Sequence, residues 1–67
     1  RRRSSLEEMF LVRVRYRADV GYRVLVGWLL SQDGRRLYVK PIGKDGEERV
    51  SKSDLEDLEI MGAVYGD

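Results

Sequence analysis

Apolar and basic residues alternate strictly in the segment FLVRVRYR, which spans Phe10 to Arg17. Because successive side chains of a strand point to opposite faces, this alternation predicts a half-buried strand. The predicted inward set is Phe10, Val12, Val14 and Tyr16, and the outward set is Leu11, Arg13, Arg15 and Arg17. The first strand should therefore give four side chains to a core and display a row of arginines on its other face.

The next segment, YRVLVGWLL at 22–30, is apolar on both faces for most of its length. This pattern is typical of a central strand that is covered on each side, and Gly27 within it indicates a bulge or a sharp bend. We expect Val26 and, on the following strand, Val39 to be buried core residues. The simplest interpretation of Trp28 is also a core position.

Two Asp-Gly pairs, at 33–34 and 45–46, mark the next two corners. An Asp-Gly pair between strand-like segments is a strong hairpin signal, because both central positions of a type I′ turn need a positive φ. We predict such a turn at the first pair, with Gly34 at positive φ. The strands that follow the two corners should occupy 35–42 and 47–51.

The segment SKSDLEDL at 51–58 breaks the alternation and suits a single helical turn with a serine cap. A last strand should follow at 59–64. The residues that this interpretation uses are Ser51 or Ser53 as the cap, and Leu55, Leu58 and Ile60 as core anchors. Five strands with closely spaced turns predict an all-β fold, a five-stranded small antiparallel barrel with a one-turn helix before the last strand.

A chain of 67 residues forms one domain with a small core. We divide it into an N-terminal basic tail with a short helical turn at 1–9, the barrel at 10–64 and a C-terminal tail at 65–67. The absence of cysteine and histidine excludes disulfides, zinc sites and Ser-His-Asp or Cys-His catalysis. No two acids are spaced to hold a substrate between them. We therefore expect no enzyme activity, no cofactor and no metal site.

The longest apolar run, at 24–30, is far shorter than the roughly 20 residues of a membrane span. The first ten residues also lack a secretory apolar stretch. We expect an intracellular protein that is not secreted and has no membrane partner, either a monomer or part of a larger chain.

Acidic and basic residues are segregated along a chain whose net charge is +1. The first 23 residues contain seven arginines and three acids, whereas residues 44–67 contain three basic residues and eight acids. The arginine row could bind phosphates, or it could form ion pairs with acids on a neighbouring strand. The acidic group of Asp54, Glu56, Asp57 and Glu59 could receive a basic peptide or a divalent cation, although its spacing is not that of a calcium loop, or it could remain a solvated face.

The order of the elements, and above all the stretch YVKPIGKDGEERVSKSDLEDL, resembles a Tudor domain of the Src-homology-3-like small β-barrel class. The likeness covers about residues 12–60. Tudor domains often hold a methylated lysine or arginine in an aromatic cage by cation–π attraction. The resemblance implies that Tyr16 takes the place of the first cage aromatic and that Tyr22 lies near the second. The places of the other two are taken by residues 41–43 and Glu47, which are not aromatic.

The leading hypothesis is a non-catalytic, Tudor-like interaction module that binds a peptide or a modified basic tail of a chromatin-associated, nuclear partner, such as a methylated histone-like tail. Its peptide-binding candidates are Tyr16, Tyr22, Tyr38 and Trp28. The alternative is a barrel that binds DNA or RNA, since the same strand order serves the C-terminal domain of retroviral integrases. The candidates for nucleic-acid binding are Arg13, Arg15, Arg17 and Arg23. In addition, RRSSL at 2–6 resembles a kinase site with Ser5 as the acceptor.

Overall fold

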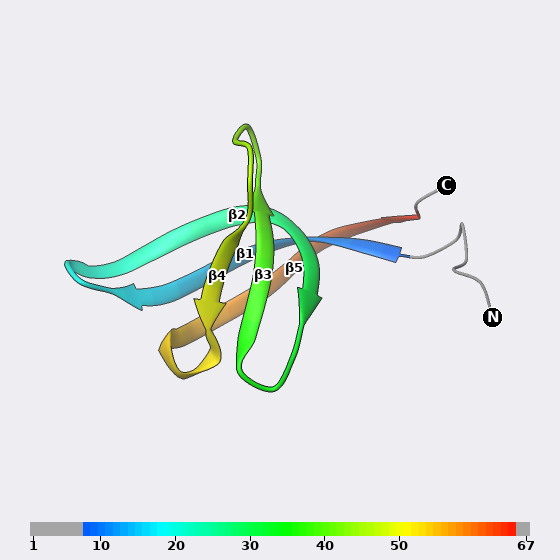
Figure 1. Ribbon diagram of the computed structural model, residues 1–67. Coiled ribbons are helices and arrows are strands. Elements are labelled where there is room, and N and C mark those ends of the chain that lie inside the picture. The colour runs from blue at the N-terminus through cyan, green and yellow to red at the C-terminus, as the bar shows by residue number, and fades with distance from the viewer. Residues whose placement is uncertain (1–7, 66–67) are drawn as a thin grey trace.

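Five antiparallel strands and one 3₁₀ turn make up the computed structural model (Figure 1). It describes residues 8–65, and the side-chain surroundings of residues 9–63. The elements are β1 (Glu8–Ala18), β2 (Gly21–Gln32), β3 (Arg36–Pro41), β4 (Glu48–Ser51), the 3₁₀ turn η1 (Lys52–Asp54) and β5 (Leu55–Tyr65). The all-β class, the five strands and the helical turn before the last strand are confirmed. The predicted kinase site at Ser5 lies outside the described residues.

The strands form a single sheet in the order β4-β3-β2-β1-β5. Its edges are β4 and β5, and no ladder joins them among residues 8–65, so the sheet does not close into the predicted barrel. The physical reason is that β4 has only four residues, while β5 pairs along β1 for most of its length. In Figure 1 the β1–β2 and β3–β4 hairpins leave the centre of the molecule in different directions. The molecule is accordingly elongated, with extents of 42 × 25 × 21 Å.

The core lies on the concave face of this bent sheet. Its fully buried side chains are Val12 and Val14 of β1, Leu37 and Val39 of β3, and Val50 of β4. Phe10, Tyr16, Leu25, Leu29 and Leu55 are partly buried against them. Because β2 separates β1 from β3 in the sheet, these residues meet only if the sheet curls around β2. The inward set predicted for the first strand and the buried position of Val39 are thus confirmed.

Gly27 allows the curl, because β2 and β3 approach each other closely at this residue. Gly27 is buried and pairs with Pro41, the last residue of β3. A Cβ atom at Gly27 would lie 2.1 Å from the carbonyl oxygen of Lys40 and 2.8 Å from the Cα of Pro41. No real Cβ occupies such a position, so only glycine fits here. The predicted bend at this residue is therefore supported by a specific backbone contact.

The convex face of β2 has no second layer among the described elements, which corrects the prediction made for this strand. Val26 is only half-buried, and its neighbour Val24 is 62% exposed. The prediction of a strand covered on both sides is therefore wrong, since only one face of β2 meets other strands. Ile60, the predicted anchor of the last strand, is 58% exposed. Ile60 pairs with Val12 and so lies on the core face, but it sits on edge strand β5, where no further strand covers it, so its predicted role as a core anchor is wrong.

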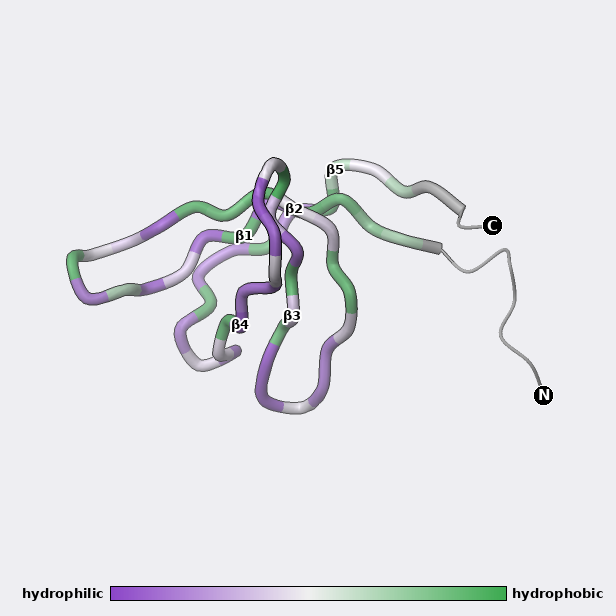
Figure 2. The backbone as a smooth tube through the Cα atoms, turned by 45° about the horizontal axis from the view of Figure 1, so that its top comes forward, coloured by the Kyte–Doolittle hydropathy of each residue, from purple (hydrophilic) through white to green (hydrophobic). Residues whose placement is uncertain are grey.

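The β2–β3 turn forms by a mechanism different from the predicted one. Only Gly21, Gly43 and Gly46 have a positive φ among the described residues, so the type I′ prediction for Gly34 is wrong. Instead, the Asp33 carboxylate accepts hydrogen bonds from the amides of Arg35, at 2.7 Å, and Arg36, at 2.8 Å. These two bonds, the Arg35 bond first, hold the pKa of Asp33 below its ordinary value of 3.8. The turn is strongly hydrophilic (Figure 2).

Candidate functional site

The arginine row of β1 points outward as predicted, but carboxylates of β5 lie beside it. The register places Arg13 opposite Glu59, and their side chains form an ion pair of 2.9 Å. Arg17 lies 3.9 Å from a carboxylate oxygen of Glu56. Both pairs are well exposed, so each contributes little to stability. They nevertheless neutralise part of the positive charge that a phosphate backbone would need.

Arg15 makes a different contact, because its guanidinium stacks on an aromatic ring. Its Cζ atom lies 4.7 Å from the centroid of Tyr22, and the Cζ atom of Arg17 lies 6.0 Å from the same centroid. The Tyr22 hydroxyl donates to a carboxylate oxygen of Glu56 at 3.3 Å. The ring of Tyr22 is therefore already engaged by arginines of the same chain.

The two tyrosines proposed for the first half of a cage leave the sheet on opposite faces. Tyr16 packs against the core, in line with the other inward residues of β1. Tyr22 pairs with Arg17, so it shares the outer face with the arginine row, and it is 47% exposed. Arg23 pairs with Tyr16 and so lies on the face opposite to that row. One cage cannot include both tyrosines in this arrangement.

Trp28 and Tyr38 are half-buried and come from neighbouring strands. Trp28 pairs with Lys40 of β3, and Tyr38 lies two residues before Lys40 on the same face, so the two aromatic residues are diagonal neighbours. Tyr22 is six residues from Trp28 along β2, which corresponds to about 20 Å. The structure therefore brings Trp28 and Tyr38 together but places Tyr22 far from both.

Sequence reasoning missed an exposed apolar row that we call the β2 outer strip, defined as Tyr22, Val24, Val26 and Trp28. The strip alternates along β2, and its members face outward because they pair with Arg17, Arg15, Arg13 and Leu11 of β1. Pairing with β3 begins only at Gly27, so residues 22–25 have no ladder partner on that side within the described range. The apolar residues on both faces of β2 were the available sequence signal for this strip. The same pattern, however, indicates a strand that is covered on both faces equally well.

A second missed feature is a shallow hollow of about 390 Å³, lined by Gly34, Arg35, Arg36, Ser51 and Ser53. Ser51 precedes η1 but makes no side-chain capping bond, and its hydroxyl instead bonds that of Ser53 at 2.9 Å. The capping role predicted for Ser51 is therefore wrong. No group of three or more His, Cys, Asp or Glu side chains in the described chain is placed to hold a metal ion. None of its helices has the length and apolar character needed to cross a membrane.

Comparison with protein-family models, curated proteins and solved structures found no significant match. The class that fold and site define is thus a small all-β domain with one bent, open five-stranded sheet. The likeness to Tudor domains rests on the order of the elements and remains an expectation.

Proposed function

We propose that this chain is a non-catalytic interaction module that binds an extended segment of a protein partner on the β2 outer strip. The observation that carries the proposal is the exposure of this apolar row on a sheet whose other face already holds the core. Val24 is 62% and Tyr22 47% exposed. Tryptophan, tyrosine and arginine are the residues that most often dominate binding energy at protein interfaces. The strip contains Trp28 and Tyr22, and Arg15 of β1 lies beside it.

The charges around the strip favour a partner segment with acidic side chains among apolar ones. Arg15 lies beside Val24, and Lys40 lies beside Trp28 on the other side. Arg15 lies opposite Asp57 of β5 but forms no ion pair with any residue of the described chain, and its guanidinium stacks on the ring of Tyr22. A carboxylate of the partner could therefore form a charge-assisted bond with it, while apolar side chains cover Val24 and Trp28.

The free edge at residues 22–25 offers backbone partners as well as side chains. Strands with an unpaired edge are common places for a peptide to add as a further strand. A segment paired there would run next to Val24, and its side chains on the convex face would lie beside the strip. Main-chain bonds would supply affinity, and the strip would supply selectivity.

Two other functions have weaker support. A methyl-binding cage would need Tyr16 and Tyr22 on one face of the sheet, and they lie on opposite faces. A nucleic-acid interface on the arginine row would bring phosphates close to Glu59 and Glu56, which already pair with Arg13 and Arg17. The peptide-binding module therefore has the better physical support.

The proposal is tested by selection from a library of random peptides of about ten residues, long enough to span the strip at about 3.3 Å per residue. A synthetic copy of an enriched peptide is then titrated into the ¹⁵N-labelled domain. We expect amide shifts concentrated at residues 22–28 and at Leu11 to Arg15. Enriched peptides that shift only amides of β4 or η1, or no enrichment over a blank surface, would overturn the proposal.

A further inference from the structure

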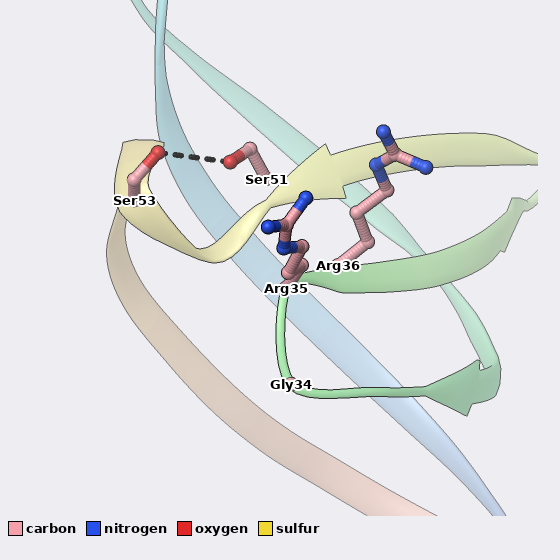
Figure 3. A pocket seen from close by; sticks show the side chains of 5 residues that line it. All are labelled: Gly34, Arg35, Arg36, Ser51 and Ser53. Atoms are coloured by element: carbon pink, nitrogen blue, oxygen red, sulfur yellow. Dashed lines mark hydrogen bonds between the residues drawn. The ribbon is translucent and has the colours of Figure 1, made fainter.

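The hollow at the β2–β3 turn is lined by two consecutive arginines that have no carboxylate partner among the described residues. Arg35 and Arg36 form no ion pair with any residue in the described part of the chain, whereas Arg13 and Arg17 of the β1 row do. In Figure 3 both side chains extend to the side of the turn that faces Ser51. Two neighbouring unpaired arginines are therefore located here, whereas two of the three arginines of the β1 row are paired with carboxylates.

Hydrogen bonds hold the main chain of both arginines in place. The Asp33 carboxylate accepts the amides of Arg35 and Arg36, and the Asp33 amide donates to the Arg36 carbonyl at 3.0 Å. The amide of Lys52 in η1 donates to the Arg35 carbonyl at 2.7 Å, and Arg36 pairs with Ser51 of β4. The Oδ1 atom of Asp33 thus orders the backbone of the turn, and neither guanidinium forms an ion pair with a carboxylate of the described residues. A preorganised site loses less entropy on binding.

The serines add uncharged donors to the same hollow. The hydroxyls of Ser51 and Ser53 lie 2.9 Å apart, so one donates to the other. Since each hydroxyl carries one hydrogen, the accepting serine keeps its own hydrogen free for a ligand. Two guanidiniums and one free hydroxyl suit a tetrahedral oxyanion, because arginine forks match phosphate oxygens.

We propose that this hollow binds a phosphate monoester. A monoester carries a charge of about −1.5 to −2 near neutral pH, which two unpaired arginines can balance. A phosphodiester chain has one charge per unit and needs a continuous basic track, and the arginine row of β1 is partly neutralised by β5. The monoester could belong to a phosphoserine of a peptide or to a small molecule. This site shares no residue with the β2 outer strip, so its failure would not affect the proposed function.

The test is a titration of the ¹⁵N-labelled domain with O-phosphoserine at constant ionic strength, with serine, which lacks the phosphate group, as the comparison. We expect shifts at Gly34, Arg35, Arg36, Ser51 and Ser53 with the phosphorylated compound only. The double variant Arg35→Gln/Arg36→Gln should weaken binding by at least about tenfold. The matched control Arg49→Gln removes an exposed arginine of β4 that does not line the hollow, and it should change binding by less than about twofold.

Further arms identify the source of the phosphate. A phosphoserine peptide that binds more tightly than inorganic phosphate would assign the site to phosphorylated protein segments, and equal binding would assign it to small phosphate compounds; both results support the proposal. Unchanged binding by the double variant would overturn it. So would a single-stranded oligonucleotide that binds more tightly than every monoester, since the ligand would then be a phosphodiester chain.

Discussion

Replacement of Gly27 by alanine should be the most damaging small change in this domain. The added Cβ would lie 2.1 Å from the Lys40 carbonyl oxygen and 2.8 Å from the Cα of Pro41. Both atoms belong to the backbone of β3, so relief requires β3 to move away from β2. We expect a loss of about 3 kcal/mol, the upper end of typical overpacking costs. A chain of 67 residues has a total stability of only about 3 to 10 kcal/mol.

The assay is urea unfolding followed by the fluorescence of Trp28, the single tryptophan, together with far-ultraviolet circular dichroism. With a slope of about 1 kcal/mol per molar urea, the midpoint should fall by about 3 M, or the variant should be unfolded in water. Gly34→Ala is the matched control, because no heavy atom lies within 4 Å of its added Cβ and its φ is not positive. It should stay within about 0.5 kcal/mol of the parent. Similar losses for the two variants would refute the close approach of β2 and β3.

Three further predictions concern the two faces of the sheet and the acid sensitivity of the turn. Val39→Ala should lower the free energy of unfolding by about 2 kcal/mol because the side chain is fully buried. Val26→Ala, on the half-buried outer face, should lower it by less than about 1 kcal/mol. A larger loss for Val26→Ala than for Val39→Ala in urea unfolding would mean that the inner and outer faces are exchanged. Arg13→Ala should change stability by less than about 0.5 kcal/mol, since its ion pair is half exposed; a loss as large as that of Val39→Ala would contradict this. The lowered pKa of Asp33 stabilises the fold fully above its unfolded value near 3.8, and this contribution is lost as the pH falls through the lower folded value. Asp33→Asn should therefore remove part of the stability loss in acid, and identical pH profiles for parent and variant would exclude this role.

The buried residues of the concave face could be predicted because the pattern that identifies them lies within one short segment of the sequence. Strict alternation in β1 identified the buried Val12 and Val14 without any knowledge of their partners. The turn at 33–36 was located correctly by its Asp-Gly pair, but the carboxylate of Asp33, not a positive φ at Gly34, organises it. Aspartate can act in either way, and the sequence pattern does not distinguish them.

The convex face and the closure of the sheet depend on contacts between distant residues. An apolar run such as that of β2 predicts burial on both faces only if a second layer exists, and none covers Val24 in the described chain. Closure would require β4 to pair with β5, which no local pattern specifies. The separation of Tyr16 and Tyr22 has a simpler cause: once the turn pairs Ala18 with Gly21, Tyr22 falls opposite Arg17 and not opposite Tyr16. If the sequence had specified which residues form that turn, the hairpin register would have predicted that the two tyrosines lie on opposite faces.

The central claim is that the β2 outer strip binds a peptide, and a pair of exposed valines tests it most directly. Val24 is 62% exposed on the strip, and Val20 is 83% exposed in the β1–β2 turn outside it. The measurement is the dissociation constant of a library-selected peptide for the parent, for Val24→Asp and for Val20→Asp. We predict at least about tenfold weaker binding to Val24→Asp and less than about twofold change for Val20→Asp. Equal binding by all three proteins would contradict the claim.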